Sequence, residues 1–302
     1  MEDKGYVWFD GKLVRSADAK VHILTHSLQY GSGIFEGIRA YKAKSGTALF
    51  RLKDHIERFV STSRIYRMEL GYTKKQLADA VVETVRKNGI ESGYIRPFAF
   101  YNDTRIGLSV SGKKVSVAIA AVPFGSYFSG KVKGIQCKVS SWKRINSEIM
   151  PPHAKASGNY RNSILASEEA KESGADEAIM LSGNGFVAEG PGENLFMVKD
   201  SKLVTPSPSA DILMGITRDS IIKIAEGLGI AVQERGVHRE ELYTADELFF
   251  SGTAAEVTPI VGVDKRQVGS GKTGPVTKLI SERFSMIATG NQEGFNDWLT
   301  YV

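Results

Sequence analysis

The alternation of helix-like and strand-like segments most constrains what this chain can fold into. In the first half, apolar side chains recur at helical spacing over residues 52–70, and a second helix is expected over 73–89, where Thr73 and Gln76 can form a capping box. The Asp-Gly pair at 10–11 predicts a hairpin. The strands expected in this half are 6–9, 12–15, 94–101 and 115–122.

The second half continues this alternation. Helices are expected over 159–172 and 217–228, and a last helix should begin at Pro275. The buried face of that last helix should carry Val276, Leu279, Ile280, Phe284 and Ile287. The strands expected here are 135–142, 177–181, 186–188 and 194–198.

Residues 123–134, PFGSYFSGKVKG, separate the two halves. They are rich in Gly and Ser and have no helical period, which is typical of a linker. We therefore expect an α/β (α+β mixed) fold of two α/β domains, a smaller one over 1–122 and a larger one over 135–302. The chain of 302 residues, 42% of them hydrophobic, has enough apolar side chains for two cores.

Composition and charge exclude several classes of protein. The net charge of +5 arises from scattered basic residues, without the clustered face of a nucleic-acid-binding protein. No apolar run reaches the ~18 residues of a membrane span, and the N-terminus lacks a signal-peptide pattern. Cys137 is the only cysteine, so no intrachain disulfide can form. We expect a cytoplasmic protein with no nucleic-acid partner and no membrane partner.

Two short patterns suggest sites that we do not expect. Residues 269–274, GSGKTG, are similar to a phosphate loop, but Arg266 stands where such a loop needs its first glycine, so a turn into the last helix is the better interpretation. His22 and His26 have the spacing of a metal pair, but no Cys or carboxylate completes the set, so no metal is expected. No G-x-S-x-G hydrolase motif occurs.

The stretch HAKASGNY, residues 153–160, places a lysine among very small residues. Lys155 follows a Pro-Pro pair, and its Ala, Ser and Gly neighbours leave room for a flat ring. A lysine that attacks a carbonyl must first lose its charge, either by desolvation or by forming a Schiff base. A solvated loop is the alternative interpretation of this stretch.

Three further turns are informative beside Lys155. Residues 215–219 (GITRD) run into a helix with Thr217 as candidate N-cap, and residues 251–255 (SGTAA) form a second turn rich in N–H groups, so both suit an anion. Glu189 lies in EGPGEN, where a carboxylate could face a protonated pyridine nitrogen. Together these features fit a phosphate-bearing aldehyde cofactor. Taken singly, helix capping and a solvated surface turn explain them as well.

Six separate segments, in this order along the chain, resemble one family. They are HSLQYGSGIFEGIRAY at 26–41, YIRP at 94–97, HAKASGNY, EGPGENLF at 189–196, GITRDSII at 215–222 and SGTAAEVTP at 251–259. The last four resemble the fold-type IV aminotransferases, which depend on pyridoxal 5′-phosphate, and the first two resemble the branched-chain amino acid aminotransferases within that group. The resemblance implies a cofactor at the interface of two domains, with Lys155 carried by the larger, C-terminal domain.

The resemblance assigns the cofactor-binding residues. Lys155 would be joined covalently to the cofactor's aldehyde and would move a proton between it and the substrate Cα. Tyr160 would hydrogen-bond the cofactor's phenolic oxygen, and Glu189 would keep its ring nitrogen protonated. The phosphate would be held by Arg58, Gly215, Ile216, Thr217 and Thr253.

The resemblance also implies one pocket for two unlike substrates. Arg96 would bind the γ-carboxylate of glutamate, and the α-carboxylate would be held by Tyr94 and the turn of Thr253, Ala254 and Ala255. An aromatic cage for aliphatic side chains would consist of Tyr30, Phe35, Tyr94, Phe124 and Tyr127. Tyr30 and Leu108 would come from a neighbouring subunit, so a homodimer would be the smallest active unit, with a higher homo-oligomer left open.

The implied reaction is ping-pong transamination between branched-chain L-amino acids (leucine, isoleucine and valine) and 2-oxoglutarate, which gives branched-chain 2-oxo acids and L-glutamate. D-amino acid aminotransferases, R-selective amine transaminases and aminodeoxychorismate lyases share the fold and cofactor, and a non-catalytic anion-binding protein is the alternative from another class. Phe124 stands where some family members have Trp, which should enlarge the pocket. Arg105 stands where others have a small residue, and it either adds a cation at the pocket mouth or faces solvent.

Overall fold

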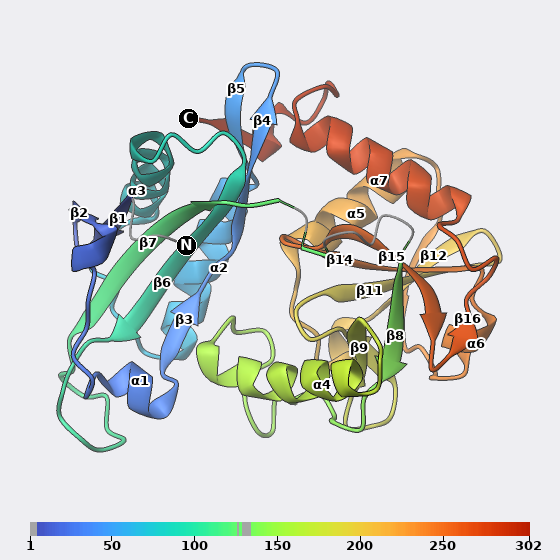
Figure 1. Cartoon of the computed structure of the whole chain (residues 1–302), viewed down its shortest axis with the longest axis horizontal. Coiled ribbons are helices and arrows are strands. Elements are labelled where there is room, and N and C mark those ends of the chain that lie inside the picture. Colours follow the sequence, from blue (N-terminus) through green and yellow to red (C-terminus); the bar gives the residue numbers. More distant parts are fainter. Residues whose placement is uncertain (1–4, 126, 129–133) are drawn as a thin grey trace. The chain divides into compact units, whose positions relative to one another are not determined.

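The computed structural model describes residues 5–125, 127–128 and 134–302 (Figure 1). By its backbone contacts the chain forms two compact units. Unit 1 comprises residues 1–125, 154–158 and 287–302, and unit 2 comprises residues 126–153 and 159–286. The chain first passes from unit 1 to unit 2 within the expected linker 123–134, of which residues 126 and 129–133 lie outside the described residues.

Unit 1 contains an antiparallel sheet in the order β17-β5-β4-β6-β7-β1-β2, with β3 paired to β6. Its strands are β1 (Tyr6–Phe9), β2 (Lys12–Arg15), β3 (Gly33–Phe35), β4 (Ile38–Ala43), β5 (Gly46–Phe50), β6 (Gly93–Tyr101), β7 (Val115–Pro123) and β17 (Leu299–Tyr301). Its α-helices are α1 (His26–Tyr30), α2 (Leu52–Ile65) and α3 (Lys74–Lys87), and short 3₁₀ turns occur at Ser16–Asp18 and Asn296–Trp298.

Helices α2 and α3 pack against one face of the unit 1 sheet (Figure 1). Apolar side chains from both layers fill the space between them, among them Ile38, Ile56, Leu77, Ile95 and Ile119. Side chains alternate across a strand, so the residues between the core positions point to the other side of the sheet.

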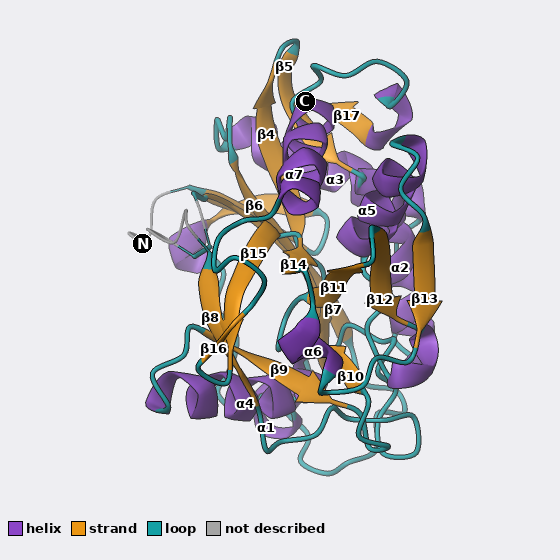
Figure 2. Ribbon diagram, turned by 90° about the vertical axis from the view of Figure 1, so that its right-hand side faces the viewer, coloured by secondary structure: helices purple, strands orange, loops and turns teal. Residues whose placement is uncertain are grey.

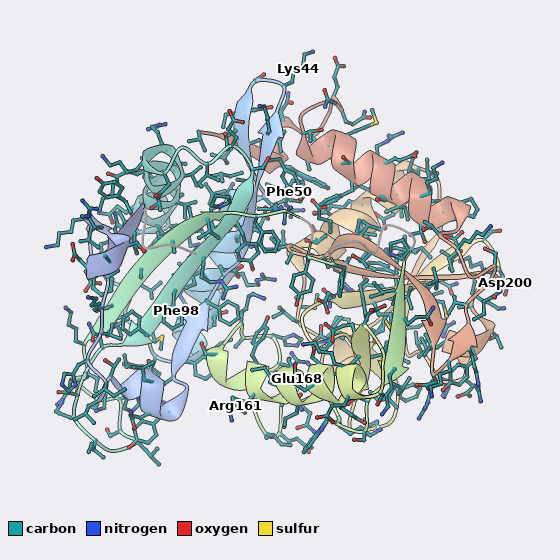
Figure 3. The ribbon with its side chains drawn as sticks, viewed as in Figure 1. Lys44, Phe50, Phe98, Arg161, Glu168 and Asp200 are labelled. Atoms are coloured by element: carbon teal, nitrogen blue, oxygen red, sulfur yellow. The ribbon has the colours of Figure 1, made fainter. Side chains whose placement is uncertain are left out.

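We call that other side of the sheet the second face. Arg39 on β4 lies opposite Tyr94 on β6, and Phe35 on β3 lies opposite Phe98, whose side chain is labelled in Figure 3. Arg96 alternates with the fully buried Ile95 and therefore belongs to the same face. The second face thus comprises Phe35, Arg39, Tyr41, Tyr94, Arg96 and Phe98.

Unit 2 contains a mixed sheet in the order β10-β9-β8-β15-β14-β11-β12-β13, with β16 paired to β15 (Figure 2). An additional pairing of β10 with β11 closes part of this sheet into a ring. The strands are β8 (Ile135–Val139), β9 (Glu177–Leu181), β10 (Val187–Glu189), β11 (Asn194–Lys199), β12 (Lys202–Pro206), β13 (Val232–Arg235), β14 (Glu247–Gly252), β15 (Glu256–Val263) and β16 (Arg266–Gln267). Apolar residues such as Ile135, Ile179, Leu195 and Phe250 form the core of this unit.

The helices of unit 2 alternate with its strands along the chain, and the last of them comes after β16. They are α4 (Tyr160–Glu172), α5 (Ile216–Gly227), α6 (Glu241–Thr244) and α7 (Pro275–Ala288), and 3₁₀ turns occur at Ser157–Asn159 and Pro208–Ala210. The last two residues of α7, and the first two of the 157–159 turn, group with unit 1. Within the described residues, no helix has the length and apolar character needed to cross a membrane.

The expected helices are present, with two differences. The capping box of Thr73 and Gln76 is confirmed at the start of α3. The helix expected over 52–70 ends at Ile65, and Arg67 adopts a left-handed φ of 55° that an α-helix cannot contain. In α7, Leu279 is 43% exposed, so its placement on the buried face was wrong.

Candidate active site

Lys155 is attached to unit 1 by its backbone. Its carbonyl oxygen accepts a hydrogen bond of 3.0 Å from Phe35 N, and Ala156 forms an antiparallel bridge with Ile34. Ala154 and Ala156 are buried on either side of it, at 2% and 3% exposure. Ala156 N donates to Ala154 O at 3.0 Å, so Lys155 is the central residue of a tight three-residue turn. Its Nζ atom lies 5.1 Å from the centroid of the Phe35 ring.

This attachment differs from the domain assignment that we expected. The resemblance placed Lys155 in the C-terminal domain, 135–302. Residues 154–158 instead group with unit 1, because Lys155 O accepts from Phe35 N and Ala156 packs in the core of that unit. The boundary at a single linker therefore does not describe the chain, since residues 287–302 also return to unit 1 through the pairing of β17 with β5.

Arg58, the expected phosphate ligand on α2, forms a two-point ion pair with Glu36. Its Nε donates to Glu36 Oε1 at 2.6 Å and its Nη2 donates to Oε2 at 2.9 Å. His55 Nδ1 lies 2.8 Å from the same Oε2 atom. Two-point pairing fixes the plane of a guanidinium as well as its position. Glu36 thus orients Arg58 and compensates its charge.

Burial and the neighbouring positive charge have opposite effects on the pKa of Glu36. Glu36 is fully buried, which opposes ionisation, yet the Arg58 charge and the bonds from His55 and Arg58 hold its pKa well below the usual range. Burial lowers the pKa of His55, and the positive charges of Arg58 and Lys155 lower it further, against the opposing effect of Glu36. The carboxylate is therefore ionised and the imidazole neutral at pH 7.

The second face carries three of the expected substrate-binding residues, Phe35, Tyr94 and Arg96, and a fourth, Phe124, lies next to Tyr94. The rings of Tyr94 and Phe124 lie 5.4 Å apart, and the Arg96 guanidinium carbon lies 4.6 Å from the Phe35 ring centroid and 5.3 Å from that of Tyr94. Gly37 is required beside them, because a Cβ atom there would lie 1.8 Å from the Tyr94 hydroxyl. These four side chains combine an apolar aromatic surface with one exposed cation.

Tyr30 and Leu108 lie on another part of unit 1, which we call the apolar patch. It comprises the exposed side chains of Ile23, Leu24, Leu28, Tyr30, Ile106 and Leu108. Hydrogen bonds join α1 to the 102–114 loop within it: Gly107 N donates to the Tyr30 hydroxyl at 3.2 Å, and His26 Nε2 lies 3.1 Å from Gly107 O. The other ring nitrogen of His26 lies 2.8 Å from Ser32 Oγ. Both nitrogens of this histidine thus have protein partners.

Arg105 in the same loop is paired within the loop itself. It binds Asp103 through Nε and Nη2, the latter at 2.8 Å from Oδ2, and donates to Gly112 O at 2.8 Å. Its side chain is 61% exposed. In the single chain this arginine is therefore exposed and paired within its own loop.

Glu189, in unit 2, is held from three sides. Arg144 Nε donates to its Oε1 at 2.7 Å, Asn194 Nδ2 donates to its Oε2 at 2.9 Å, and Leu213 N lies 3.0 Å from Oε2. The residue is 4% exposed. A buried carboxylate with these donors is fixed in direction, so it can face a cationic ring nitrogen.

The N-terminus of α5 lies next to Glu189 in the same hydrogen-bonded group. Gly215 is its N-cap, and no side chain caps the helix, so the placement of Thr217 at the N-cap was wrong. Thr217 is instead the second helical residue and is 4% exposed. Gly215 is required because a Cβ there would lie 2.0 Å from Asn194 Oδ1. The first N–H groups of α5 therefore have no side-chain cap, and helix starts of this kind suit anions.

The start of α7 shows what a filled helix terminus looks like in this chain. Glu247 Oε1 accepts from Val276 N at 3.0 Å, and its Oε2 accepts from Thr277 N at 2.7 Å. The protein's own carboxylate thus occupies the place that a phosphate would take after GSGKTG. The expectation that residues 269–274 form a turn into the last helix is confirmed.

The remaining expected residues of unit 2 lie in the turn between β14 and β15, at the start of α4 and at position 127. Thr253, Ala254 and Ala255 form the turn between β14 and β15, and Tyr160 is the first residue of α4. Beside that turn, Ser251 pairs across the strands with Asn194, and its buried Oγ has no hydrogen-bond partner among the described residues. Tyr127 is 48% exposed and makes an edge contact with Phe128.

The donor set of unit 2 fits the cofactor that the resemblance implies. Pyridoxal 5′-phosphate carries a phosphate group and a basic ring nitrogen, which match an uncapped helix start and a buried carboxylate. The unpartnered Ser251 hydroxyl is a further polar atom that a ligand can satisfy.

Five residues around these groups were missed from the sequence. Arg144, Asn194 and Leu213 hold Glu189, and Glu36 and His55 hold Arg58. Glu36 stands inside the quoted segment 26–41 and Asn194 inside 189–196, so proximity to a motif was a signal for both. Arg144 is a single basic residue in an irregular stretch, and no local pattern distinguishes it.

Known proteins match this chain over nearly its whole length. A family model described as amino-transferase class IV matches residues 33–263. A branched-chain-amino-acid aminotransferase of Escherichia coli (strain K12) is 46% identical over 300 residues, which cover 98% of this chain and 97% of the relative.

Solved structures agree in fold. A branched-chain aminotransferase from the thermophilic archaeon Thermoproteus uzoniensis, crystallised with norvaline, is 48% identical, covers 98% of both chains and superposes with a TM-score of 0.94. A branched-chain amino acid aminotransferase from Thermobaculum terrenum, in its PLP-bound holo form, is 35% identical, covers 99% of both chains and has a TM-score of 0.93.

Proposed function

Because the chain belongs to the class IV aminotransferase family, we propose that it transfers amino groups between branched-chain L-amino acids and 2-oxoglutarate, with pyridoxal 5′-phosphate as cofactor. The expected mixed α/β fold of fold-type IV is confirmed by the same likenesses. One observation carries the proposal: the 46% identity to the E. coli relative spans 98% of this chain. The family match over 33–263 contains every residue assigned to the site except Tyr30.

The resemblance assigns a role to each cofactor-binding residue. Glu189 would face the ring nitrogen, Tyr160 the phenolic oxygen, and the N–H groups of Ile216 and Thr217 the phosphate, with Thr253 as a further donor. Arg58 would also donate to the phosphate. The bound cofactor supplies an electron-withdrawing ring that makes the substrate Cα–H bond easier to break. Glu189 would sustain that effect by keeping the ring nitrogen protonated.

Lys155 would move the proton. As a neutral amine, its Nζ would accept the proton from the substrate Cα and pass it to the cofactor. This is general acid–base catalysis. The backbone bond from Phe35 N and the buried alanines at 154 and 156 fix where the lysine side chain starts. A fixed base loses less entropy when it reaches the transition state.

The second face would select the substrate. Phe35, Tyr94 and Phe124 offer an aromatic surface to aliphatic side chains, worth roughly 0.8 kcal/mol for each buried CH₂ group. Arg96 lies over two of these rings and is exposed, so its guanidinium can meet the γ-carboxylate of glutamate. One surface can thus accept both substrates of a ping-pong reaction.

Half-reactions test the proposal directly. The purified holoprotein should lose its cofactor absorbance with L-leucine and regain it with 2-oxoglutarate, while D-alanine leaves the spectrum unchanged. Borohydride reduction should attach the cofactor mass to Lys155, located by peptide mass spectrometry, and Lys155→Ala should abolish both signals. Turnover of D-alanine with inert L-leucine would identify a D-amino acid enzyme instead, and a protein that takes up no cofactor would refute aminotransferase chemistry altogether.

We also propose a homodimer as the smallest active unit, in the cytoplasm. The apolar patch supports the dimer, because six large side chains exposed together on one surface are typical of a protein–protein interface. Tyr30 and Leu108, assigned to a neighbouring subunit's site, both belong to this patch. Two equal patches meeting about a twofold axis would bury each other.

A further inference from the structure

The carboxylate assigned to the cofactor's ring nitrogen already has a cation of this chain bonded to it. Arg144 Nε donates to Glu189 Oε1 at 2.7 Å, and the two residues are 8% and 4% exposed. Burying an arginine carries a desolvation penalty of its own, and a carboxylate that serves only to meet a cationic ring does not need it. Asn194 and Leu213 also donate to Glu189, but through neutral amide groups. The positive charge of Arg144 therefore calls for a separate explanation.

The backbone on both sides of Arg144 is held by neighbouring elements. Arg144 N donates to Leu181 O, at the end of β9, at 2.8 Å. Asn162 on α4 is bonded to the two adjacent residues. Its Nδ2 donates to Lys143 O at 2.9 Å, and its Oδ1 accepts from Ile145 N at 3.2 Å. With its backbone fixed from two elements, the arginine has the support expected of a residue that orients or tunes another.

A carboxylate and a pyridine nitrogen that are hydrogen-bonded share one proton, which can lie at either end. With the proton on nitrogen the two groups form an ion pair, and with the proton on oxygen they form a neutral pair. Burial favours the neutral pair, because an interior of low polarity penalises separated charges. Only the ion pair gives the ring the positive charge that withdraws electrons from the substrate. The buried position of Glu189 by itself thus favours the less useful state.

A positive charge bonded to the carboxylate changes that balance. Two cations bonded to one carboxylate lie farther from each other than from the carboxylate between them, so attraction outweighs repulsion. Arg144 thus lowers the free energy of the ion pair, and it has little such effect on the neutral pair. The amide donors of Asn194 and Leu213 act in the same direction, because a hydrogen bond to a charged oxygen is stronger than one to a neutral oxygen.

We propose that Arg144 is a positioning residue that keeps the shared proton on the cofactor's ring nitrogen by stabilising the charge of Glu189. This inference rests on the proposed function and adds to it a residue that acts only through Glu189. Without the arginine's charge, the proton passes from the ring nitrogen to a Glu189 oxygen. An N–H bond breaks and an O–H bond forms, so the ion pair becomes a neutral pair and no proton enters or leaves the site. The ring then withdraws electrons less strongly.

The position of the proton can be measured directly on the holoprotein. The cofactor is labelled with ¹⁵N at its ring nitrogen, whose magnetic resonance distinguishes a pyridinium from a neutral pyridine. The wild type and Arg144→Lys, which both carry a charge at this position, should give the pyridinium signal. Arg144→Gln keeps a donor but no charge, so its signal should shift to that of the neutral pyridine. The matched control Arg218→Met removes another buried arginine of unit 2, bonded to Glu234 at 2.6 Å, and should keep the pyridinium signal.

A double variant tests whether Arg144 acts through Glu189. Glu189→Gln should by itself give the neutral pyridine signal, because an amide does not hold the proton on the ring nitrogen. Adding Arg144→Gln to Glu189→Gln should leave that signal where it is. A further shift in the double variant would show that Arg144 reaches the ring by another route, and this would overturn the proposal.

The rate of proton removal from the substrate Cα is an independent readout. In the half-reaction with L-leucine, Arg144→Gln should slow the loss of cofactor absorbance roughly 10- to 100-fold. Deuterium at the leucine Cα should slow it further, by a larger factor than in the wild type, because cleavage of that bond becomes rate-limiting. Arg218→Met should keep the wild-type isotope effect.

Three results of the resonance experiment would overturn the proposal. They are a pyridinium signal in Arg144→Gln, a neutral pyridine in the wild type, and loss of the pyridinium signal in Arg144→Lys, where the charge is kept. Should Arg144→Gln not give the wild-type circular dichroism spectrum, Arg144→Met takes its place, with the same expected signal. A wild type that takes up no cofactor or does not transaminate L-leucine would fail the proposed function itself, which is a separate outcome.

Discussion

At Glu36 and at Glu189, a carboxylate with almost no exposed surface is bonded to an arginine. The Glu36–Arg58 pair is closed by His55, and the Glu189–Arg144 pair is closed by Asn194 and the Leu213 amide. Such groups are costly to break, because the surviving charge stays in the interior without a partner. Such bonds also fix orientation. Glu36 holds the Arg58 guanidinium in one plane, and Glu189 is itself held in one direction.

Arg144 should matter to stability as much as to catalysis. Arg144→Met leaves Glu189 buried without its cation, so the free energy of unfolding should fall by roughly 3–5 kcal/mol. The double variant Arg144→Met with Glu189→Gln removes both charges and should lose less than the sum of the two single variants. Urea unfolding followed by tryptophan fluorescence measures all three. Additive losses would mean that the pair is not coupled in the folded protein.

At the scale of elements, the surroundings of the first turn of α5 come from strand β11 and from the loop before the helix. Asn194 on β11 fills the space where a side chain at 215 would stand, and its amide links Glu189 with the Leu213 carbonyl. The helix start is left uncapped as a consequence, whereas Glu247 fills the start of α7. Two helices of one unit therefore differ in whether an outside anion can reach their first N–H groups.

Two glycines of α5 offer a matched test of this arrangement. Gly215→Ala should displace Asn194, since the new Cβ would lie 2.0 Å from Asn194 Oδ1, and should weaken cofactor retention. Gly227→Ala, at the other end of the same helix, meets no atom within 4 Å and should be neutral or stabilising by up to about 1 kcal/mol. Dialysis of both holoproteins against a cofactor-free buffer, followed by absorbance, measures retention. Equal retention in the two variants would contradict the role given to Gly215.

For the molecule as a whole, the apolar patch is a hydrophobic surface that the single chain leaves exposed. Ile106 and Leu108 are each 79% exposed, which is unusual for side chains of this size outside an interface. Both extend from a loop in which Asp103 pairs with Arg105 and Lys113. Ile106 and Leu108 are the large apolar side chains that this loop exposes.

Charge placed in the patch should separate subunits. Ile106→Glu with Leu108→Glu should convert dimers to monomers in sedimentation velocity, because two buried charges of like sign cannot both be accommodated at a twofold interface. If Tyr30 and Leu108 of the partner subunit complete the site, activity should be lost together with the dimer. Leu279→Glu, a similar change at a 43% exposed leucine of α7, serves as the control and should leave the mass unchanged. A dimeric, fully active double variant would rule out the patch as the interface.

The sequence by itself determined the elements and the chemically distinctive residues. Helices with apolar spacing, the capping box at Thr73 and the strands flanked by turn residues depend on neighbours within a few positions, so local pattern suffices for them. Lys155, Glu189 and the two glycine-bearing turns could also be singled out, because a lysine among small residues and a carboxylate among glycines are unusual in any fold.

Only the tertiary structure decided what surrounds those residues. Arg144 reaches Glu189 across 45 positions and Glu36 reaches Arg58 across 22, and the placement of 154–158 in unit 1 follows from a backbone bond to Phe35. The backbone around Arg144 is fixed only because β9 and α4 supply its partners, Leu181 O and the Asn162 side chain. These contacts depend on residues far apart in the sequence. The spacing of apolar residues along the chain does not indicate which distant residue will be the hydrogen-bond partner.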